Sequence, residues 1–587
     1  MKIAACALNQ TPLDWKGNVK RMLAAIEEAK RQHTDLLLFP ELSLSGYGCE
    51  DYFLMPWVFQ TSREYLLQIL LPASEGLILA VGLPWRHREK NYNTLAICHD
   101  GKLIGLYAKQ ILASGGVFYE NRWFHPWEAN HNEELQDLPG VLFGDFLFNR
   151  RGVNIGFEIC EDAWHPEERP AVKGAARHAD LILNASASNF ARGKVSQRHR
   201  VVESLQGRHE GWYLYTNLLG NESGNLIFDG EIILGKAGKV LHSSPILSMA
   251  EWKLEIFKLD EYRHWPGPAH SGSDFEEFTA AACLGLKDYL RKSGSKGFTL
   301  SLSGGADSAA CAVLVAEMLR RGREEIGEEE LSRQLNTQAE IKNLLCCVYQ
   351  ASENSGDVTK NAAAGLALTL GADFHVWEIG QVIGQYRSLA EAALGRKLSW
   401  EQDDLTLQNI QARSRAPGIW MLANTRNHLL LTTGNRSEAD VGYCTMDGDT
   451  AGSLAPMAGV SKHFIRQWLV WAKDALNLPV LEQIICQAPT AELRPGLQTD
   501  EGDLMPYELL EQIEILFLVE KISPEEIASR LAETRSESPE YLKEHVQKFM
   551  HLWKRSQWKR ERMAPSFHLD RFNIIPRSMG RFPVFCG

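Results

Sequence analysis

The chain has 587 residues, which is too many for one hydrophobic core and predicts at least two large domains. Apolar residues make up 44% and charged residues 23%, as in an ordinary globular protein, and the net charge of −12 argues against a general nucleic-acid-binding surface. The amino terminus lacks the residue order of a signal peptide, and no apolar run approaches the roughly 18 residues of a membrane span. We therefore expect a cytoplasmic protein without nucleic-acid or membrane partners.

The cysteines give no sign of a zinc site or a disulfide framework. Eleven cysteines are scattered along the chain without a CxxC pair. Cys346 and Cys347 are adjacent and lie in an apolar run that is typical of a buried strand.

The first part of the chain alternates short apolar runs with longer amphipathic ones. Helical patterns cover 18–32 and 171–178. The runs that we expect to form strands are KIAACALN, LLLFPEL, GLILAVGLP, NTLAICHDGKLIGLYAK, VNIGFEIC, DLILNAS and GWYLYTNLL. This alternation predicts a layered α/β domain over 1–262, followed by a linker rich in Pro, Gly and Ser over 263–277.

A second α/β pattern covers 278–587. A helix through Tyr289, a strand at 298–302 and a helix from Asp307 are followed by the strand NLLCCVYQ, a helix from Asp357 and the strand FHVWEI. This order predicts a doubly wound parallel sheet with ligands at the carboxyl ends of its strands. Residues 506–562 read mostly as amphipathic helix, and the tail after Pro565 reads as irregular.

The stretch FTLSLSGGADS, residues 298–308, has the features of a phosphate-binding turn. Its glycines let backbone N–H groups approach an anion, and the helix that follows points its positive end at the same anion. Asp307 has the same sign of charge as phosphate, so a bridging divalent cation is expected. The stretch resembles the PP-loop ATP pyrophosphatase superfamily, which implies adenylation by ATP with loss of pyrophosphate.

Three charged or nucleophilic side chains follow separate strands of the first domain. Glu41 comes after LLLFP, Lys109 after LIGLYA, and Cys160 ends the strand NIGFEI. A carboxylate, an ammonium group and a thiol at one edge of a sandwich are what nucleophilic amide hydrolysis requires.

The motifs around these residues resemble the nitrilase (carbon–nitrogen hydrolase) superfamily. They are FPELSLSGY, YAKQ followed by VFYENRWF, and GFEICEDAWHP. The resemblance implies an αββα sandwich in which Cys160 is the nucleophile, Glu41 the general base and Lys109 the cation that stabilises the tetrahedral intermediate. It implies that Glu120 helps to hold the lysine. The residues implied to bind glutamine are Phe118, Glu161, Ser186 and Ser188.

Four further strings resemble the glutamine-dependent NAD synthetase family over essentially the whole chain: LQNIQARSR, TTGNRSEADVGYCTMDGD, PTAELRPGLQTDEGDLMPYE and QWKRERMAP. The resemblance implies that glutamine, ATP and nicotinic acid adenine dinucleotide are substrates, with Mg²⁺ bound by Asp307 and Glu438, and that the protein is a homo-oligomer. The implied ATP-binding residues are Ser303, Gly304, Gly305, Asp307, Ser308 and Thr433. The implied dinucleotide-binding residues are Asn409, Arg413, Glu438, Asp449, Lys462 and Lys559, with Arg560 beside the last.

Two other functions stay open at this point. Gly115 stands where synthetase-linked members of the family often carry an aromatic residue, and GNESGNLIFDGEI departs from their usual segment. These departures favour an amidotransferase that uses another ω-amide donor or another carboxylate acceptor. A non-catalytic nucleotide-binding scaffold is the third possibility, although Cys160, Glu41, Lys109 and Asp307 are all present.

Overall fold

The computed structural model describes residues 1–261, 267–268, 272–488, 493–495, 499–574 and 582–584. The chain forms two compact units, Met1–Asp288 and Tyr289–Gly587. The predicted linker falls partly outside the described residues, and helix α6, Asp274–Ser293, begins within it. In the described part of the chain, no helix combines the length and the apolar character needed to cross a membrane.

The first unit contains two large sheets. The first has the strand order β16-β1-β2-β3-β4-β5-β7-β6, and the second β17-β15-β14-β11-β10-β9-β8. The strands of the first sheet are β1 Lys2–Leu8, β2 Leu36–Leu38, β3 Ile78–His87, β4 Lys90–His99, β5 Lys102–Ala108, β6 Asn132–Glu134, β7 Leu142–Gly144 and β16 Trp252–Lys258. Those of the second are β8 Phe148–Arg150, β9 Val153–Ile159, β10 Leu181–Ser186, β11 Trp212–Asn217, β14 Ile232–Lys236, β15 Lys239–Ser243 and β17 Gly267–Pro268; β12 Leu219–Asn221 pairs with β13 Ile227–Asp229.

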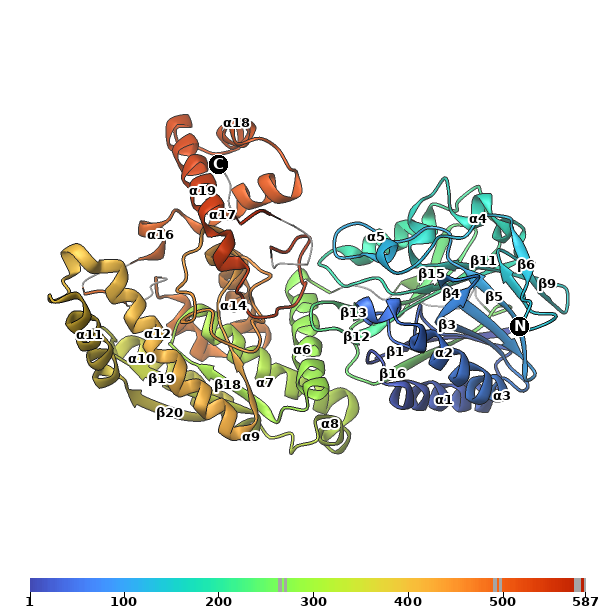
Figure 1. The fold of residues 1–587 in the computed structure, drawn as a ribbon, viewed down its shortest axis with the longest axis horizontal. Coiled ribbons are helices and arrows are strands. Elements are labelled where there is room, and N and C mark those ends of the chain that lie inside the picture. Colours follow the sequence, from blue (N-terminus) through green and yellow to red (C-terminus); the bar gives the residue numbers. More distant parts are fainter. Residues whose placement is uncertain (262–266, 269–271, 489–492, 496–498, 575–581, 585–587) are drawn as a thin grey trace. The chain divides into compact units, whose positions relative to one another are not determined.

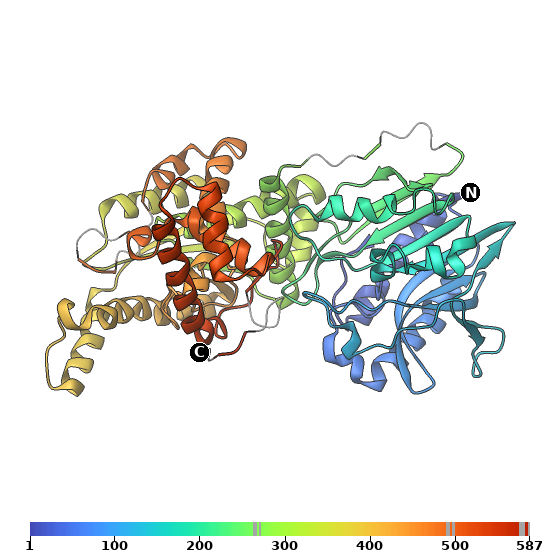
Figure 2. The same cartoon turned by 90° about the horizontal axis from the view of Figure 1, so that it is seen from above.

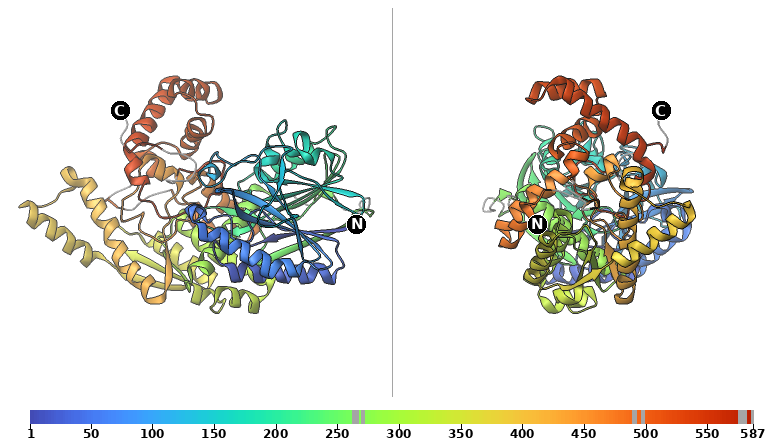
Figure 3. Two further views of the ribbon diagram at one scale, coloured as in Figure 1. Left: turned by 45° about the vertical axis from the view of Figure 1, so that its right-hand side comes forward. Right: turned by 90° about the vertical axis from the view of Figure 1, so that its left-hand side faces the viewer.

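Helices cover the outer face of each sheet. On the first sheet, α1 (Trp15–Arg31) buries Met22 and Ile26 in one cluster with Cys6 and Leu37. The other α-helices that precede α6 are α2 Pro56–Tyr65, α3 Leu71–Ala73, α4 Pro170–Lys173 and α5 Lys194–Glu203. The short 3-10 and π helices are η1 Glu50–Leu54, η2 Leu66–Leu70, η3 Glu120–Arg122, η4 Cys160–Trp164 and η5 Ala175–His178. Residues of α4, η5 and α5 pack against β10 and β11 of the second sheet. Figures 1 and 3 show the blue and teal helices on opposite sides of the strands, which confirms the predicted αββα sandwich.

Two expected elements of this unit differ in detail. The run NTLAICHDGKLIGLYAK was expected to be one strand but forms the hairpin of β4 and β5, because Asp100 and Gly101 both have a positive φ, as a tight two-residue turn requires. The helix expected over 171–178 is broken at Gly174 into α4 and η5.

The second unit is built on four parallel strands in the order β20-β19-β18-β21. They are β18 Gly297–Ser301, β19 Leu345–Ala351, β20 Asp373–Glu378 and β21 His428–Leu431. Helix α12 covers one face, where Ile419 and Ala423 pack on Val348 and Leu430. Helices α7 and α10, which connect β18 to β19 and β19 to β20, contact each other. Figure 2 shows α11 and the start of α12, in gold, as neighbouring helices.

Besides the short helices η7 Pro479–Leu481 and η8 Ile515–Val519, the described helices of this unit are α7 Ala306–Ile326, α8 Glu328–Leu335, α9 Ile341–Leu344, α10 Asp357–Leu370, α11 Gly380–Leu394, α12 Trp400–Arg426, α13 Arg436–Val441, α14 Lys462–Ala475, α15 Glu482–Ile485, α16 Asp500–Asp503, α17 Tyr507–Glu514, α18 Pro524–Thr534 and α19 Pro539–Arg560. The last three form a separate apolar cluster around Leu510, Ile527 and Phe549. The predicted doubly wound sheet and its helical carboxyl-terminal segment are therefore confirmed.

Candidate active sites

Cys160 lies in a strained turn at the end of β9. Its φ of +42° is in the left-handed region, which costs a non-glycine residue about 1–3 kcal/mol. The buried Asp162 carboxylate holds this turn, because it accepts hydrogen bonds from the Ile159 N–H at 2.9 Å and the Ile111 N–H at 2.7 Å. The second bond ties the cysteine turn to the segment that follows Lys109.

Lys109 joins the two glutamates that the sequence predicts to act with Cys160. Its Nζ lies 2.6 Å from Glu41 Oε1 and 2.8 Å from Glu120 Oε2, and all three side chains are buried. The Tyr47 hydroxyl donates to Glu120 Oε1 at 2.8 Å, and the Asn93 amide donates to Glu41 Oε1 at 2.7 Å. Glu41 Oε2 accepts no hydrogen bond from the residues that the structure describes, so this oxygen is available to accept a proton.

Burial and mutual charge set the protonation of these groups. Burial raises the pKa of Glu41 to about 7, although the Lys109 ammonium opposes the rise. Burial alone would lower the pKa of Lys109, but Glu120 and Glu41 overcome that effect and raise it well above its ordinary value. Burial, reinforced by the charge of Glu41, also raises the pKa of the Cys160 thiol. The arrangement is a protonated thiol, a base poised near neutrality and a permanently charged cation.

The two serines predicted to bind glutamine have different surroundings. The Ser186 hydroxyl donates to Asn184 Oδ1 at 2.6 Å inside the second sheet. The Ser188 hydroxyl is buried and has no hydrogen-bond partner among the described residues, while its backbone N–H is held by Asn217 Oδ1 at 2.8 Å. Ser188 is thus the serine with hydrogen-bonding capacity left for a ligand.

Phe118 and Glu161 contact different side chains. The Phe118 ring packs edge-on against Tyr47, with the ring centroids 6.1 Å apart. The Glu161 carboxylate, one residue after Cys160, lies 3.0 Å from His165 Nε2 and is partly exposed. A Cβ at Gly115 would meet no atom within 4 Å, so the missing aromatic side chain leaves open space.

Lys194 is a partly buried cation near the same site, and no motif in the sequence indicates it. It is the first residue of α5, and its Nζ donates to Asn189 Oδ1 at 2.6 Å. The same Nζ lies 5.7 Å from the Phe118 ring centroid and 5.8 Å from that of Trp164. Burial, with a smaller contribution from the charge of Arg198, lowers its pKa to about 8, while the Cys160 sulfur opposes this.

The phosphate-binding turn of the second unit connects β18 to α7. Gly304 has a φ of +83°, and a Cβ there would lie 2.2 Å from the Thr359 carbonyl oxygen, so only glycine fits. Gly305 caps α7, and the Ser303 and Ser308 hydroxyls lie 3.1 Å apart beside it. The turn presents hydroxyls and the amino end of a 21-residue helix, a combination suited to phosphate.

A cavity of about 490 Å³ opens at this turn. The predicted residues that line it are Ser303, Gly305, Asp307, Ser308, Thr433, Glu438, Asp449 and Lys462. The Lys462 ammonium forms an ion pair with Asp307 and lies 3.5 Å from Glu438 Oε1, so both carboxylates converge on one cation. Burial raises the pKa of Glu438 to about 8, against the effect of Lys462, and Asp307 adds to the rise. Converging carboxylate oxygens are the donor set that Mg²⁺ prefers.

The remaining predicted residues surround the loop at 442–449. Asn409 Oδ1 accepts from the Thr445 hydroxyl at 2.8 Å, and Arg413 Nε donates to the Met446 carbonyl at 3.0 Å. Lys559 Nζ donates to the Gly442 carbonyl at 2.6 Å. These three residues and Gly304 do not line the cavity as described. Arg560 is buried between α13 and α19, and 489–492 and 496–498 of the PTAELRPGLQTDEGD string lie outside the described residues.

Comparisons with known proteins match both units of the chain. The NAD synthase family matches residues 278–563, and the carbon-nitrogen hydrolase family matches residues 2–242. Glutamine-dependent NAD(+) synthetases of Aquifex aeolicus and Thermotoga maritima are 31% and 30% identical, each over 90% of this chain and 91% of the relative. A crystal structure of a glutamine-dependent NAD(+) synthetase from Cytophaga hutchinsonii is 42% identical, with a TM-score of 0.89, and the match covers 100% of this chain and 98% of that one.

The chain belongs to the glutamine-dependent NAD(+) synthetases. The predicted family and function are therefore confirmed: the chain is a glutamine-dependent NAD synthetase, a ligase whose nitrilase-type domain supplies a glutaminase activity. The departures at Gly115 and in the GNESGN segment do not remove it from this family.

Besides Lys194, the structure of the synthetase adds Asp162, Tyr47 and Gln350 to its sites. Asp162 and Tyr47 belong to the motifs GFEICEDAWHP and FPELSLSGY, but the sequence predicted no role for either. Gln350 and Arg415 line the cavity at the β18–α7 turn, and the Gln350 amide donates to the Arg415 carbonyl at 2.8 Å. These contacts join distant segments, so residue spacing in the sequence carries no signal for them.

Proposed function

We propose that Cys160, Glu41, Lys109 and Glu120 perform the glutaminase half-reaction. Glu41 takes the thiol proton as the Cys160 sulfur attacks the glutamine amide carbon, and Lys109 offsets the charge on the oxygen. The C–N bond then breaks, ammonia leaves with the proton from Glu41, and water attacks the thioester to release glutamate. The observation that carries this proposal is the Lys109 ammonium held between two buried carboxylates, one with an oxygen left to accept a proton.

We assign glutamine binding to residues around the same thiol. Ser188 offers a buried hydroxyl, Glu161 directly follows Cys160 in the chain, and Phe118 packs against Tyr47. We add Lys194, whose partly buried ammonium suits the α-carboxylate of glutamine. Ser186 takes a supporting role through Asn184.

In the second unit, we assign ATP to the turn at Ser303, Gly304, Gly305 and Ser308, with Thr433 on the cavity wall. The pyridine carboxylate of nicotinic acid adenine dinucleotide attacks the α-phosphorus and displaces pyrophosphate; ammonia then attacks the acyl carbon and displaces AMP. Asp307 and Glu438 would hold Mg²⁺, which neutralises phosphate charge when bound. Lys462 would turn to phosphate when the metal replaces it between the carboxylates.

We assign the dinucleotide to Asn409, Arg413, Asp449 and Lys559. Their side chains brace the loop at 442–449, and Asp449 also lines the cavity. Their contacts to this loop support a role of these four residues in shaping the binding site for the dinucleotide.

We also infer a homo-oligomer, and we keep the predicted cytoplasmic location as part of the proposal. Helix α11 exposes Val382, Tyr386 and Leu389, which recur at helical spacing on one face and are 40%, 46% and 68% exposed. A stripe of this kind on a helix is typical of a surface covered by a partner.

Replacing the thiol separates the two half-reactions. Cys160→Ala should abolish NAD synthesis from glutamine and leave synthesis from ammonium intact, because only the first requires a nucleophile in the nitrilase-type unit. Product formation is measured with each nitrogen source, and Asp307→Asn is the matched control that should stop both. Equal loss of both activities in Cys160→Ala, with the protein folded, would contradict the assignment of separate sites.

A further inference from the structure

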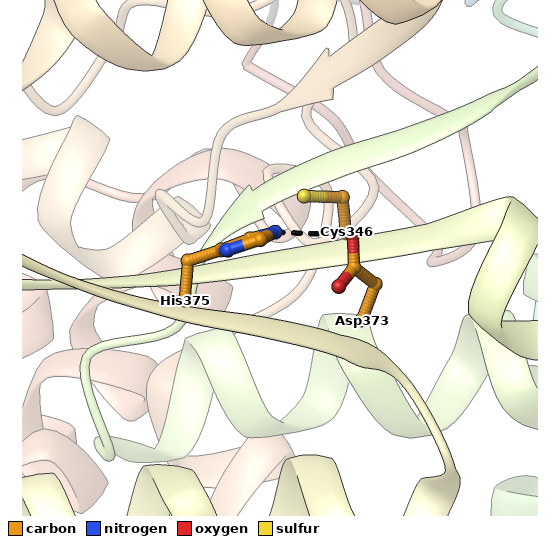
Figure 4. Close-up of side chains that lie close together, drawn as sticks. All are labelled: Cys346, Asp373 and His375. Atoms are coloured by element: carbon orange, nitrogen blue, oxygen red, sulfur yellow. Dashed lines mark hydrogen bonds and ion pairs between the residues drawn. The ribbon is translucent and has the colours of Figure 1, made fainter.

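Three side chains that are common metal ligands meet on one face of the sheet in the second unit. Cys346 lies on β19, and its register partner on β20 is Asp373. His375 lies two residues further along β20 and therefore on the same face. Their potential ligand atoms all lie within 4.8 Å of one another. Figure 4 shows that the three side chains point toward a common space.

The combination of ligand types selects among metals. A thiolate and an imidazole are borderline-soft ligands that favour Zn²⁺ over Mg²⁺, and a carboxylate completes a three-residue set with room for water as a fourth ligand. None of the three residues lines the nucleotide cavity, where the donors are hard carboxylate oxygens. We propose that Cys346, Asp373 and His375 form a binding site for a Zn²⁺-type cation, separate from the proposed Mg²⁺ site.

Arg426 is the cation that faces this cluster in the structure. It is the last residue of α12, and its Nη1 lies 2.5 Å from Asp373 Oδ2. Its Nη2 lies 3.4 Å from His375 Nε2, which in turn lies 3.1 Å from Asp373 Oδ2. A metal ion must therefore displace the guanidinium group, and the 31% exposure of the Arg426 side chain gives it a path into solvent.

The exchange changes what ties the sheet to its covering helix. Arg426 links the end of α12 to β20, whereas a metal ion bound by Cys346 and Asp373 links β19 to β20. Binding therefore replaces a helix-to-strand contact by a strand-to-strand contact. Removing Arg426 should therefore raise the affinity for the metal, whereas removing any of the three ligands should lower it.

The test measures cobalt and zinc binding to the full chain in the presence of excess Mg²⁺. Co²⁺ reports a thiolate ligand through its sulfur-to-metal absorption in the near ultraviolet, and equilibrium dialysis with Zn²⁺ gives stoichiometry and affinity. Cys346→Ser should lose the absorption. It should also weaken zinc binding by at least roughly 10–100-fold, because even the loss of a residue that only contacts a metal ligand has an effect of that size. Cys347→Ser is the matched control, because this equally buried thiol is on the opposite face of β19.

Two further variants keep the test decisive. His375→Asn removes a partly exposed ligand, so it tests the site even if Cys346→Ser does not fold. Arg426→Gln should tighten zinc binding, since it removes the competing cation. Equal zinc affinity in Cys346→Ser and Cys347→Ser, or in His375→Asn and the unmodified chain, would overturn the proposal, and so would weaker binding in Arg426→Gln.

Discussion

At the scale of single residues, Ser186 and Ser188 offer a matched comparison, because Ser186 ends β10 and Ser188 lies two residues beyond it. Ser188→Ala removes a buried hydroxyl with no partner among the described residues, so it should raise the KM for glutamine about fivefold, the equivalent of one hydrogen bond of about 1 kcal/mol. Ammonium-driven synthesis should not change. Steady-state kinetics with the two nitrogen sources measure both effects.

Ser186→Ala is the control for this prediction. It deprives Asn184 of a buried hydrogen bond and should lower the free energy of unfolding by about 1 kcal/mol with little change in KM. A rise in KM confined to Ser186→Ala would show that the two serines have been assigned the wrong way round.

The sequence indicated which charged side chains come together where they directly follow strands, but it did not do so for side chains from other parts of the chain. Glu41 and Lys109 follow apolar runs, so the fold had to bring them to one edge, and their contact at 2.6 Å is the result. Lys194 begins a helix after a glycine, where a lysine is usually solvated, and its partial burial beside the Phe118 and Trp164 rings depends on tertiary packing. Cys346 was expected in a buried strand, but its neighbours on β20 are set by sheet register, which spacing does not reveal.

At the scale of elements, the turn between β18 and α7 depends on one glycine. Gly304→Ala places a Cβ 2.2 Å from the Thr359 carbonyl in a left-handed conformation, which alone costs about 1–2 kcal/mol. We expect it to lower the free energy of unfolding by more than that amount and to depress synthesis from both nitrogen sources. Chemical denaturation and product assays check the two effects.

Gly305→Ala is the matched control for the fold. Its φ of −90° suits any residue, and its Cβ would meet only the Ser303 hydroxyl, at 3.4 Å. Its stability should therefore stay close to that of the unmodified chain. Equal destabilisation by the two substitutions would mean that helix propensity, and not the left-handed turn, decides the result.

The order of the elements was predictable because strands and helices alternate with clear apolar periodicity. The positions of turns and helix breaks were harder to recognise. The β4–β5 hairpin was missed since both of its strands are buried and apolar, and the Asp100-Gly101 turn is the only interruption. The break at Gly174 follows from close packing: a Cβ there would lie 2.7 Å from Asp145 Oδ2. Close contacts of this kind arise from tertiary packing, and their only trace in the sequence is a glycine.

At the scale of the whole molecule, the exposed stripe on α11 predicts self-association. Val382, Tyr386 and Leu389 lie at i, i+4 and i+7, so one helix face presents them together. Leu389→Glu puts a charge at the carboxyl-terminal end of this apolar stripe, on its most exposed side chain, and burying an unpaired carboxylate in an interface costs several kcal/mol. The variant should therefore show a smaller mass than the unmodified chain in light scattering after size-exclusion chromatography.

Leu368→Glu serves as the control, because Leu368 is 84% exposed on α10 and is not part of the stripe. Its mass should match that of the unmodified chain across the same concentration range. A monomeric unmodified chain, or dissociation by both substitutions alike, would show that the α11 stripe is not the contact surface. Dissociation by Leu389→Glu alone, with glutaminase turnover retained, would separate assembly of the synthetase from the chemistry of its nitrilase-type unit.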